Sequence, residues 1–331
     1  MNEAIAKLQP YAEYASHPLA LLALFLAASC LMIWRLNAIE RKGFEGTVVG
    51  TLIMPYCSGA PNLAFAYVMA RGGDAAQGGR LLMENAIVNN VTNLTLVLGV
   101  AALLGTAAQT ARAKKAAVAL RLDRLDLLLT LVALFLFTGV LWALGRDRTL
   151  DRNDALVLIA LFVFWQVLHV FEILKNNLRK NQRPHWSIAF DLLLVGACAW
   201  AVYSSVDHLV QWVETAQNRV FSMERLGWLS GLLTVLPNAL LAVYYARAGR
   251  PDIVVTSQVG DAHICIPMCV GLFALFSPIH VPGYFEFSMA LLLAAGAVHF
   301  LCTATIGRLP APLGWALIGT YAGFMYAGVF R

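Results

Sequence analysis

Two related segments of the chain determine its fold. Residues 59–104 read GAPNLAFAYVMARGGDAAQGGRLLMENAIVNNVTNLTLVLGVAALL, and residues 235–276 read VLPNALLAVYYARAGRPDIVVTSQVGDAHICIPMCVGLFALF. Both segments contain Pro-Asn, then a small-residue apolar stretch that ends in Ala-Arg-x-Gly, then a polar helical start and an apolar run with Val and Gly. This similarity indicates an internal duplication.

Apolar runs recur along the whole chain, and each is long enough to cross a bilayer, which takes about 20 residues. They predict ten membrane spans, at residues 18–36, 44–70, 81–107, 125–145, 154–174, 186–204, 226–247, 254–277, 284–304 and 311–329. Backbone groups in lipid must bond internally, and no run alternates as a barrel strand does, so we expect helices. The polar stretch 205–225 is expected to be an interfacial helix. The fold class is therefore an all-α polytopic membrane protein.

Composition agrees with this class and excludes several functions. The chain is 60% hydrophobic and 13% charged, whereas soluble domains carry roughly 25% charged residues. The net charge of +5 comes from basic residues in short loops, which does not indicate a nucleic-acid partner. The six cysteines lie in or beside apolar runs without zinc-site spacing, so no structural metal and no cofactor are expected. No nucleophile–base pair or phosphate loop indicates an enzyme.

The two copies are expected to run in opposite directions through the membrane. The first lies on spans 2–3 and the second on spans 7–8, and an offset of five spans is odd. The chain is therefore divided into a first five-helix repeat at 1–150, with its repeated motif at about 57–104, and a second at 151–331, with its motif at about 233–276. Inverted repeats with proline-interrupted helices are typical of transporters with a site at the bilayer midplane.

The basic residues predict the orientation. Most of the 24 Lys and Arg residues fall in the connections after spans 1, 3, 5, 7 and 9, which places that side in the cytoplasm and both termini outside. The composition and short loops favour a bacterial cytoplasmic (inner) membrane. The lipid bilayer and small cations are the expected partners.

Polar residues inside the repeats are the candidate site, because polar groups at membrane depth usually line a cavity or pair with one another. Asn85, Asn89 and Asn93 share one helical face, and Ser257, Asp261 and Cys265 occupy the equivalent positions of the second copy. The expected cation ligands are Asn62, Asn89, Asn93, Asn238 and Asp261. Further candidates are Ser58, Glu84, Asn85, Thr234, Ser257, His263 and Cys265.

Two prolines are expected to add backbone oxygens to this site. Pro61 and Pro237 are predicted to break their helices and free carbonyl groups. Amide, hydroxyl and carbonyl oxygens with one or two carboxylates suit a hard cation. The alternative for each Asn and Ser is an ordinary interhelical hydrogen bond, worth about 0.6–2 kcal/mol.

The pattern resembles the cation/calcium exchanger superfamily, the sodium/calcium exchangers and their prokaryotic relatives. Their repeats read G-T-S-x-P-E and later G-N-x-x-G-S-N-x-x-[ND]; here CSGAPN (57–62) precedes ENAIVNNVTNLTLVLG (84–99), and LTVLPN (233–238) precedes TSQVGDAHIC (256–265). The resemblance implies ten helices in two inverted halves and a cation site between them. It also implies a departure, because Asn62 and Asn238 replace the two Glu residues that are central calcium ligands in the family.

Three functions follow as hypotheses. The first is a secondary cation antiporter that alternates access to a midplane site, with sodium, protons or calcium as its transported cations. Loss of both Glu residues favours monovalent ions or protons over calcium. The second is an exchanger-fold carrier of another solute, or a sensor that transports nothing. The third, a membrane-embedded enzyme, has no supporting motif.

Overall fold

The computed structural model describes residues 17–41, 59–72, 74–112, 124–180, 187–216, 222–248, 251–307 and 309–329. Nearly all of these residues are helical. The first half contains α2 (Pro18–Arg41), α5 (Ala60–Arg71), α6 (Ala75–Val91), η2 (Thr92–Val97), α7 (Leu98–Arg112), α8 (Arg124–Leu144), η3 (Gly145–Asp147) and β1 (Thr149–Leu150). The second half contains α9 (Arg152–Lys180), α10 (Ser187–Ala216), η4 (Met223–Arg225), α11 (Leu226–Ala248), α12 (Pro251–Ile264), η5 (Cys265–Val270), α13 (Gly271–Phe276), β2 (Ile279–His280), α14 (Phe285–Thr305) and α15 (Ala311–Val329).

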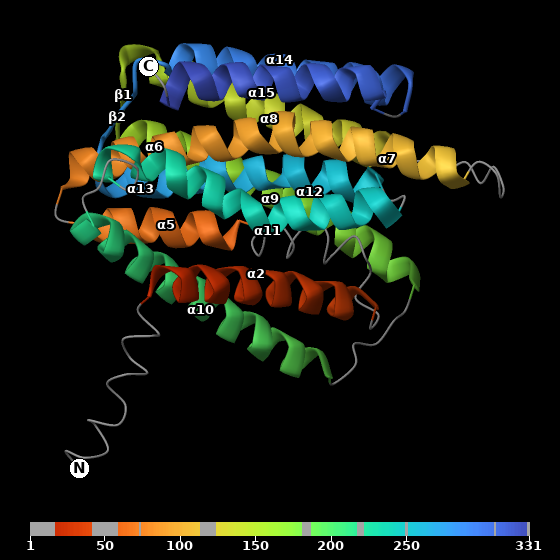
Figure 1. Ribbon diagram of the computed structural model, residues 1–331, viewed down its shortest axis with the longest axis horizontal. Coiled ribbons are helices and arrows are strands. Elements are labelled where there is room, and N and C mark those ends of the chain that lie inside the picture. The colour runs from red at the N-terminus through yellow and green to blue at the C-terminus, as the bar shows by residue number, and fades with distance from the viewer. Residues whose placement is uncertain are drawn as a thin grey trace.

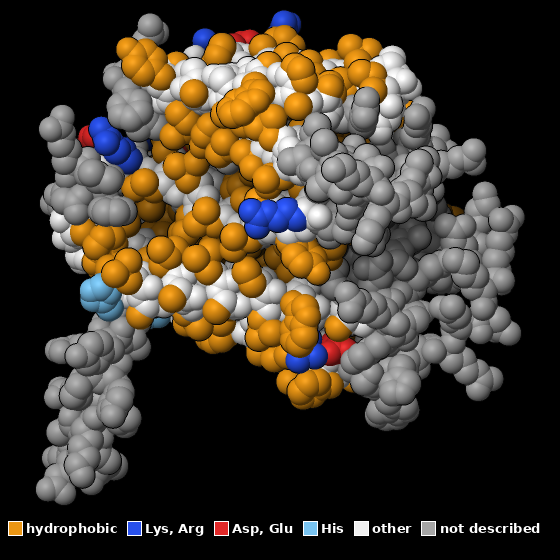
Figure 2. Space-filling model, turned by 45° about the vertical axis from the view of Figure 1, so that its right-hand side comes forward, with side chains coloured by type: hydrophobic (Ala, Val, Ile, Leu, Met, Phe, Trp, Pro, Cys, Tyr) orange, Lys and Arg blue, Asp and Glu red, His pale blue; other side chains and the backbone are white. Residues whose placement is uncertain are grey.

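These elements confirm the polytopic helical fold. Because α6, η2 and α7 run on continuously, as do α12, η5 and α13, the described part of the chain contains ten helical segments, each overlapping one predicted span. Residues 44–58 of the second predicted span lie outside the described residues. Seven of the described helices are long and apolar enough to cross a membrane. Figure 2 shows that orange hydrophobic side chains cover much of the described face, with few charged groups among them. Such a surface is suited to lipid rather than water.

The helices lie side by side and roughly parallel, with α2 and α10 at one edge and α14 and α15 at the other (Figure 1). Their contacts repeat between the halves. Helix α7 packs on α15 in the same way that α13 packs on α9, while α2 pairs with α10 and α8 with α14. Moving both helices of a pair by five spans gives a pair that also packs together. This is expected for two related five-helix units. The two-stranded sheet pairs Thr149 with His280 and Leu150 with Ile279, which ties the halves together at one end.

Each long repeat helix changes to π-helical hydrogen bonding near its middle. The π segment Thr92–Val97 begins three residues after Asn89, and Cys265–Val270 begins four residues after Asp261. These are equivalent places in the two copies. Short π segments are rare and frequently mark functional sites. The sequence analysis did not predict them.

Two expectations about helix ends are wrong. Helix α11 continues through Pro237 without interruption, so this proline does not break it. Proline still lacks the N–H that would bond to the carbonyl four residues earlier. Helix α10 extends to Ala216, so residues 205–216 continue the sixth span instead of forming an interfacial helix. The buried residues Val206, Val210 and Val213 recur every three or four positions, which gives this extension an apolar packing face.

Candidate cation site

Asn89 of α6 lies at the centre of a buried polar cluster. Its amide nitrogen donates to Asn62 Oδ1 on α5 at 3.2 Å and to Thr234 Oγ1 on α11 at 3.0 Å. Its amide oxygen accepts from Asn93 Nδ2 at 3.0 Å and from Cys265 Sγ at 3.7 Å. Both protons and both lone pairs of this amide are therefore used. Asn89 joins elements of both halves and holds the cluster together.

Asn93 connects this centre to the carboxyl group of Asp261. Its amide nitrogen donates to Asp261 Oδ2 at 2.9 Å, across 168 residues of sequence. The side chain of Asn238 lies close to the same carboxyl group. None of these three residues is more than 1% exposed. Among the described residues, Asp261 is the only carboxylate in the cluster, so it supplies the negative charge.

Four buried side-chain oxygens of this cluster have no hydrogen-bond partner among the described residues. They are Asn93 Oδ1, Asn238 Oδ1, Gln258 Oε1 and Asp261 Oδ1. Buried polar atoms are nearly always paired, because an unpaired one costs about 1–3 kcal/mol. Asn62 Nδ2 and Asn238 Nδ2 are unpaired as well, so the cluster also holds two unused donors. The four oxygens are the type of group that coordinates a hard cation.

Gln258 was missed by the sequence analysis. Its amide nitrogen donates to the Asn238 backbone oxygen at 3.2 Å and to Ser257 Oγ at 3.1 Å, which fixes the amide and leaves its oxygen unpaired. Gln258 is fully buried. It lies three residues before Asp261 and thus on nearly the same helical face. This spacing could have identified Gln258 as a candidate site residue from the sequence.

Two glycines of α11 allow the cluster to form. A Cβ atom on Gly227 would lie 2.6 Å from Glu84 Cβ, and one on Gly231 would lie 2.8 Å from Val88 Cβ. The Gly-x-x-x-Gly spacing therefore brings the backbones of α6 and α11 unusually close. At this crossing Asn85 Nδ2 donates to Ser230 Oγ at 3.0 Å. The sequence analysis did not single out this glycine pair.

The π segment that carries Asn93 is supported from α14. His299 Nε2 donates to the Leu94 carbonyl oxygen at 2.7 Å, and both residues are fully buried. A carbonyl can only accept, so the His299 proton must be on Nε2. This contact gives His299 a structural role.

Two sequence candidates lie outside the cluster. Glu84 forms an ion pair with Arg80, with 3.4 Å between Oε1 and Nη1. His263 bonds through Nε2 to the Thr130 carbonyl oxygen at 3.1 Å, and its ring packs against Phe137. The structure does not join either residue to the hydrogen bonds around Asn89.

Ser257 and Pro61 lie near the cluster without a place among its unpaired oxygens. Ser257 donates to the Val254 carbonyl at 3.0 Å and accepts from Gln258, so it borders the cluster. Pro61 is buried at the second residue of α5. Ser58 lies outside the described residues. Within the described ranges, no group of three or more His, Cys, Asp or Glu residues is arranged to hold a metal ion.

The sequence profile described as "Sodium/calcium exchanger protein" matches residues 18–171 and 188–330, which is most of the chain. The chain therefore belongs to this family of membrane cation-exchange proteins. No curated protein matches the sequence.

Solved structures of one exchanger share the fold. The sodium-calcium exchanger NCX_Mj, soaked with 2.5 mM Na⁺ and 10 mM Sr²⁺, superposes with a TM-score of 0.67 at 18% identity, covering 94% of this chain and 96% of that one. NCX_Mj soaked with 10 mM Na⁺ and zero Ca²⁺ gives a TM-score of 0.66 at the same identity and coverage. At this identity the likeness establishes the fold and leaves the ions open.

Proposed function

We propose that the protein is a secondary cation antiporter that alternates access to the buried cluster between its two repeats. The observation that carries the proposal is the set of four unpaired buried oxygens on Asn93, Asn238, Gln258 and Asp261. They come from helices of both halves, so relative motion of the halves would open or disassemble the site. Asn89, with its amide fully used, acts as the organiser and not as a direct ligand.

The charge of the site favours a monovalent cation such as sodium, exchanged for protons or a second cation. One carboxylate at about 4 Å stabilises a unit charge by about 4 kcal/mol at an effective dielectric constant of 20. Amide oxygens complete a coordination shell but add no net charge. Since Asn62 and Asn238 stand where the family pattern has Glu, the site lacks the carboxylates that a divalent ion requires for tight binding. Calcium is therefore expected to bind weakly.

The two repeats are proposed to be residues 1–150 and 151–331, in a bacterial inner membrane with both termini outside. This topology agrees with the distribution of basic residues in the connections. Labelling of single cysteines, placed at Asp74 and at Ser222 in a cysteine-free background, with an impermeant reagent tests it. Both connections are expected to react from the outside of intact cells, and reaction only after the membrane is opened would reverse the orientation.

Ion flux in proteoliposomes tests the transport proposal. The purified chain is reconstituted with sodium inside, and sodium exit is measured against external protons, potassium or calcium for the wild type and Asp261→Ala. Glu286→Gln is the matched control, because this carboxylate accepts from Trp142 Nε1 at 2.7 Å outside the cluster.

Sodium exchange that is lost in Asp261→Ala and retained in Glu286→Gln supports the proposal. Rapid calcium uptake by the wild type would contradict the monovalent site while keeping antiport. Absence of any cation flux in the wild type would favour the second candidate, an exchanger-fold carrier of another solute or a sensor. The amide-to-amide hydrogen bonds around Asn89 are the feature consistent with that alternative.

A further inference from the structure

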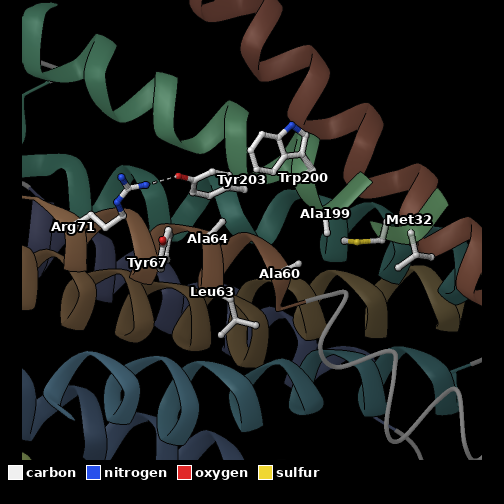
Figure 3. A pocket seen from close by; sticks show the side chains of 10 residues that line it. Met32, Ala60, Leu63, Ala64, Tyr67, Arg71, Ala199, Trp200 and Tyr203 are labelled. Atoms are coloured by element: carbon white, nitrogen blue, oxygen red, sulfur yellow. Dashed lines mark hydrogen bonds between the residues drawn. The ribbon is translucent and has the colours of Figure 1, made fainter. Parts of the chain in front are cut away.

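A groove of about 650 Å³ runs between α2, α5 and α10, outside the polar cluster (Figure 3). Its walls are almost entirely apolar. Met32 of α2, Leu63 and Ala64 of α5, and Ala199 of α10 contribute to its lining. The small alanine side chains leave the space that larger residues would fill. The volume lies within the range of about 300–1,000 Å³ that is typical of ligand sites.

One end of the groove carries a positive charge surrounded by aromatic rings. Arg71 Nη1 donates to the Tyr203 hydroxyl at 3.3 Å, and its guanidinium carbon lies 5.6 Å from the Tyr67 ring centroid (Figure 3). The Tyr203 ring packs against Tyr67 at 5.7 Å and against Trp200 at 5.6 Å. Tyrosine and tryptophan are enriched at the membrane–water boundary, so this ring cluster marks the level of the lipid headgroups.

Arg71 keeps most of its hydrogen-bonding capacity for a ligand. Its side chain forms no ion pair with a described residue, although Asp207 lies near enough to act on its charge. Of five guanidinium N–H groups, one is used by the Tyr203 hydroxyl. The remaining N–H groups can bind two oxygens of a phosphate in the bidentate geometry that arginine favours.

The length of the groove matches one leaflet of a bilayer. Ala60 and Arg71 are the first and last residues of α5 and both line the groove. Eleven steps of 1.5 Å give about 16 Å between them. Half of a hydrocarbon core of about 30 Å is about 15 Å. A chain that begins at the headgroup level beside Arg71 would therefore reach the bilayer midplane beside Ala60.

We propose that the groove is a binding site for one membrane phospholipid, with its phosphate on Arg71 and one acyl chain between α2, α5 and α10. Charge and length together identify this occupant, since the cationic end lies at headgroup level and the apolar part extends for one leaflet. In the orientation proposed above, this leaflet is on the outer side of the membrane. The inference concerns a surface separate from the cation cluster and holds whichever ion is transported.

Lipid binding to the full-length chain tests the proposal. Protein stripped of lipid in detergent is titrated with dioleoyl-phosphatidylglycerol, with dioleoylglycerol, which lacks the phosphate, and with inorganic phosphate, and bound molecules are counted by native mass spectrometry. The variants are Arg71→Gln, which removes the charge, and Ala199→Phe, which fills the groove. Arg146→Gln is the control, because Arg146 lies 6.0 Å from the Trp142 ring but does not line the groove.

The wild type is expected to bind one phosphatidylglycerol at least tenfold more tightly than dioleoylglycerol, and to bind inorganic phosphate no better than dioleoylglycerol. Arg71→Gln should reduce phosphatidylglycerol affinity to the dioleoylglycerol level, Ala199→Phe should weaken both lipids, and Arg146→Gln should change neither. Thermal unfolding of each variant without lipid verifies that it is folded. Unchanged phosphatidylglycerol binding in folded Arg71→Gln, or equal binding of inorganic phosphate, overturns the proposal.

Discussion

The close approach of α6 and α11 gives the sharpest prediction, for the substitution Gly231→Ala. The added Cβ would lie 2.8 Å from Val88 Cβ and 2.9 Å from the Asn85 backbone oxygen. Carbon atoms in good contact are about 3.5–4.0 Å apart, so the helices must separate by at least about 0.7 Å. The Asn85–Ser230 hydrogen bond, now 3.0 Å, would then exceed the normal range.

The expected cost combines two effects. Overpacking costs about 1–3 kcal/mol, and each weakened interhelical hydrogen bond costs about 0.6–2 kcal/mol. The bond from Asn89 to Thr234 lies one turn along the same crossing and should also weaken. The total is about 2–7 kcal/mol, and cation affinity should fall because Thr234 helps to hold Asn89.

The assay is thermal unfolding in detergent together with cation flux in proteoliposomes. Gly260→Ala is the matched control, since Gly260 is buried in α12 beside Asp261 but its added Cβ would meet nothing within 4 Å. The control should be neutral or stabilising by about 0.5–1 kcal/mol, the usual gain from alanine over glycine in a helix. Wild-type stability and flux in Gly231→Ala would refute the reasoning.

Three further outcomes are expected. Asp261→Asn keeps the shape of the side chain but removes its charge. The loss of about 4 kcal/mol of attraction should weaken sodium binding by about three orders of magnitude. Isothermal titration calorimetry measures the affinity, and an unchanged value contradicts the prediction. His299→Ala leaves the Leu94 carbonyl unpaired and should cost about 1–3 kcal/mol in thermal unfolding, with partial rescue by His299→Gln; no rescue would attribute the loss to packing. Joint Asn62→Glu and Asn238→Glu should raise calcium affinity at least tenfold in ⁴⁵Ca²⁺ binding, and unchanged affinity would show that charge count does not select the ion.

The position of the spans was predictable because it depends on local composition. A run of about 20 apolar residues must be helical in lipid whatever its neighbours are. The prediction failed at Pro237, where a helix break was inferred from a single residue. Pro237 removes a single hydrogen bond, and the surrounding helix of α11 is stable enough to continue through it.

The candidate site was predicted in part. Asn89 and Asn93 share one helical face and bond to each other, as their spacing predicts. Asn62 and Asp261 come from other helices, and the fold brings them to this face. Glu84 satisfied the same rule of polar residues at membrane depth and yet pairs with Arg80. A difference of one position rotates a side chain about 100° around the helix, so neighbours in sequence face different partners.

The sequence by itself determined the membrane class, the two related halves and the polar faces of the repeat helices. Only the tertiary structure decided which polar groups meet and which oxygens stay unpaired. Contacts such as Asn93 with Asp261 and Asn89 with Thr234 join residues 168 and 145 positions apart. They depend on how each helix is rotated and how closely it approaches its neighbour. Rotation and approach are set by packing between helices, such as that at Gly227 and Gly231, and no local pattern encodes them.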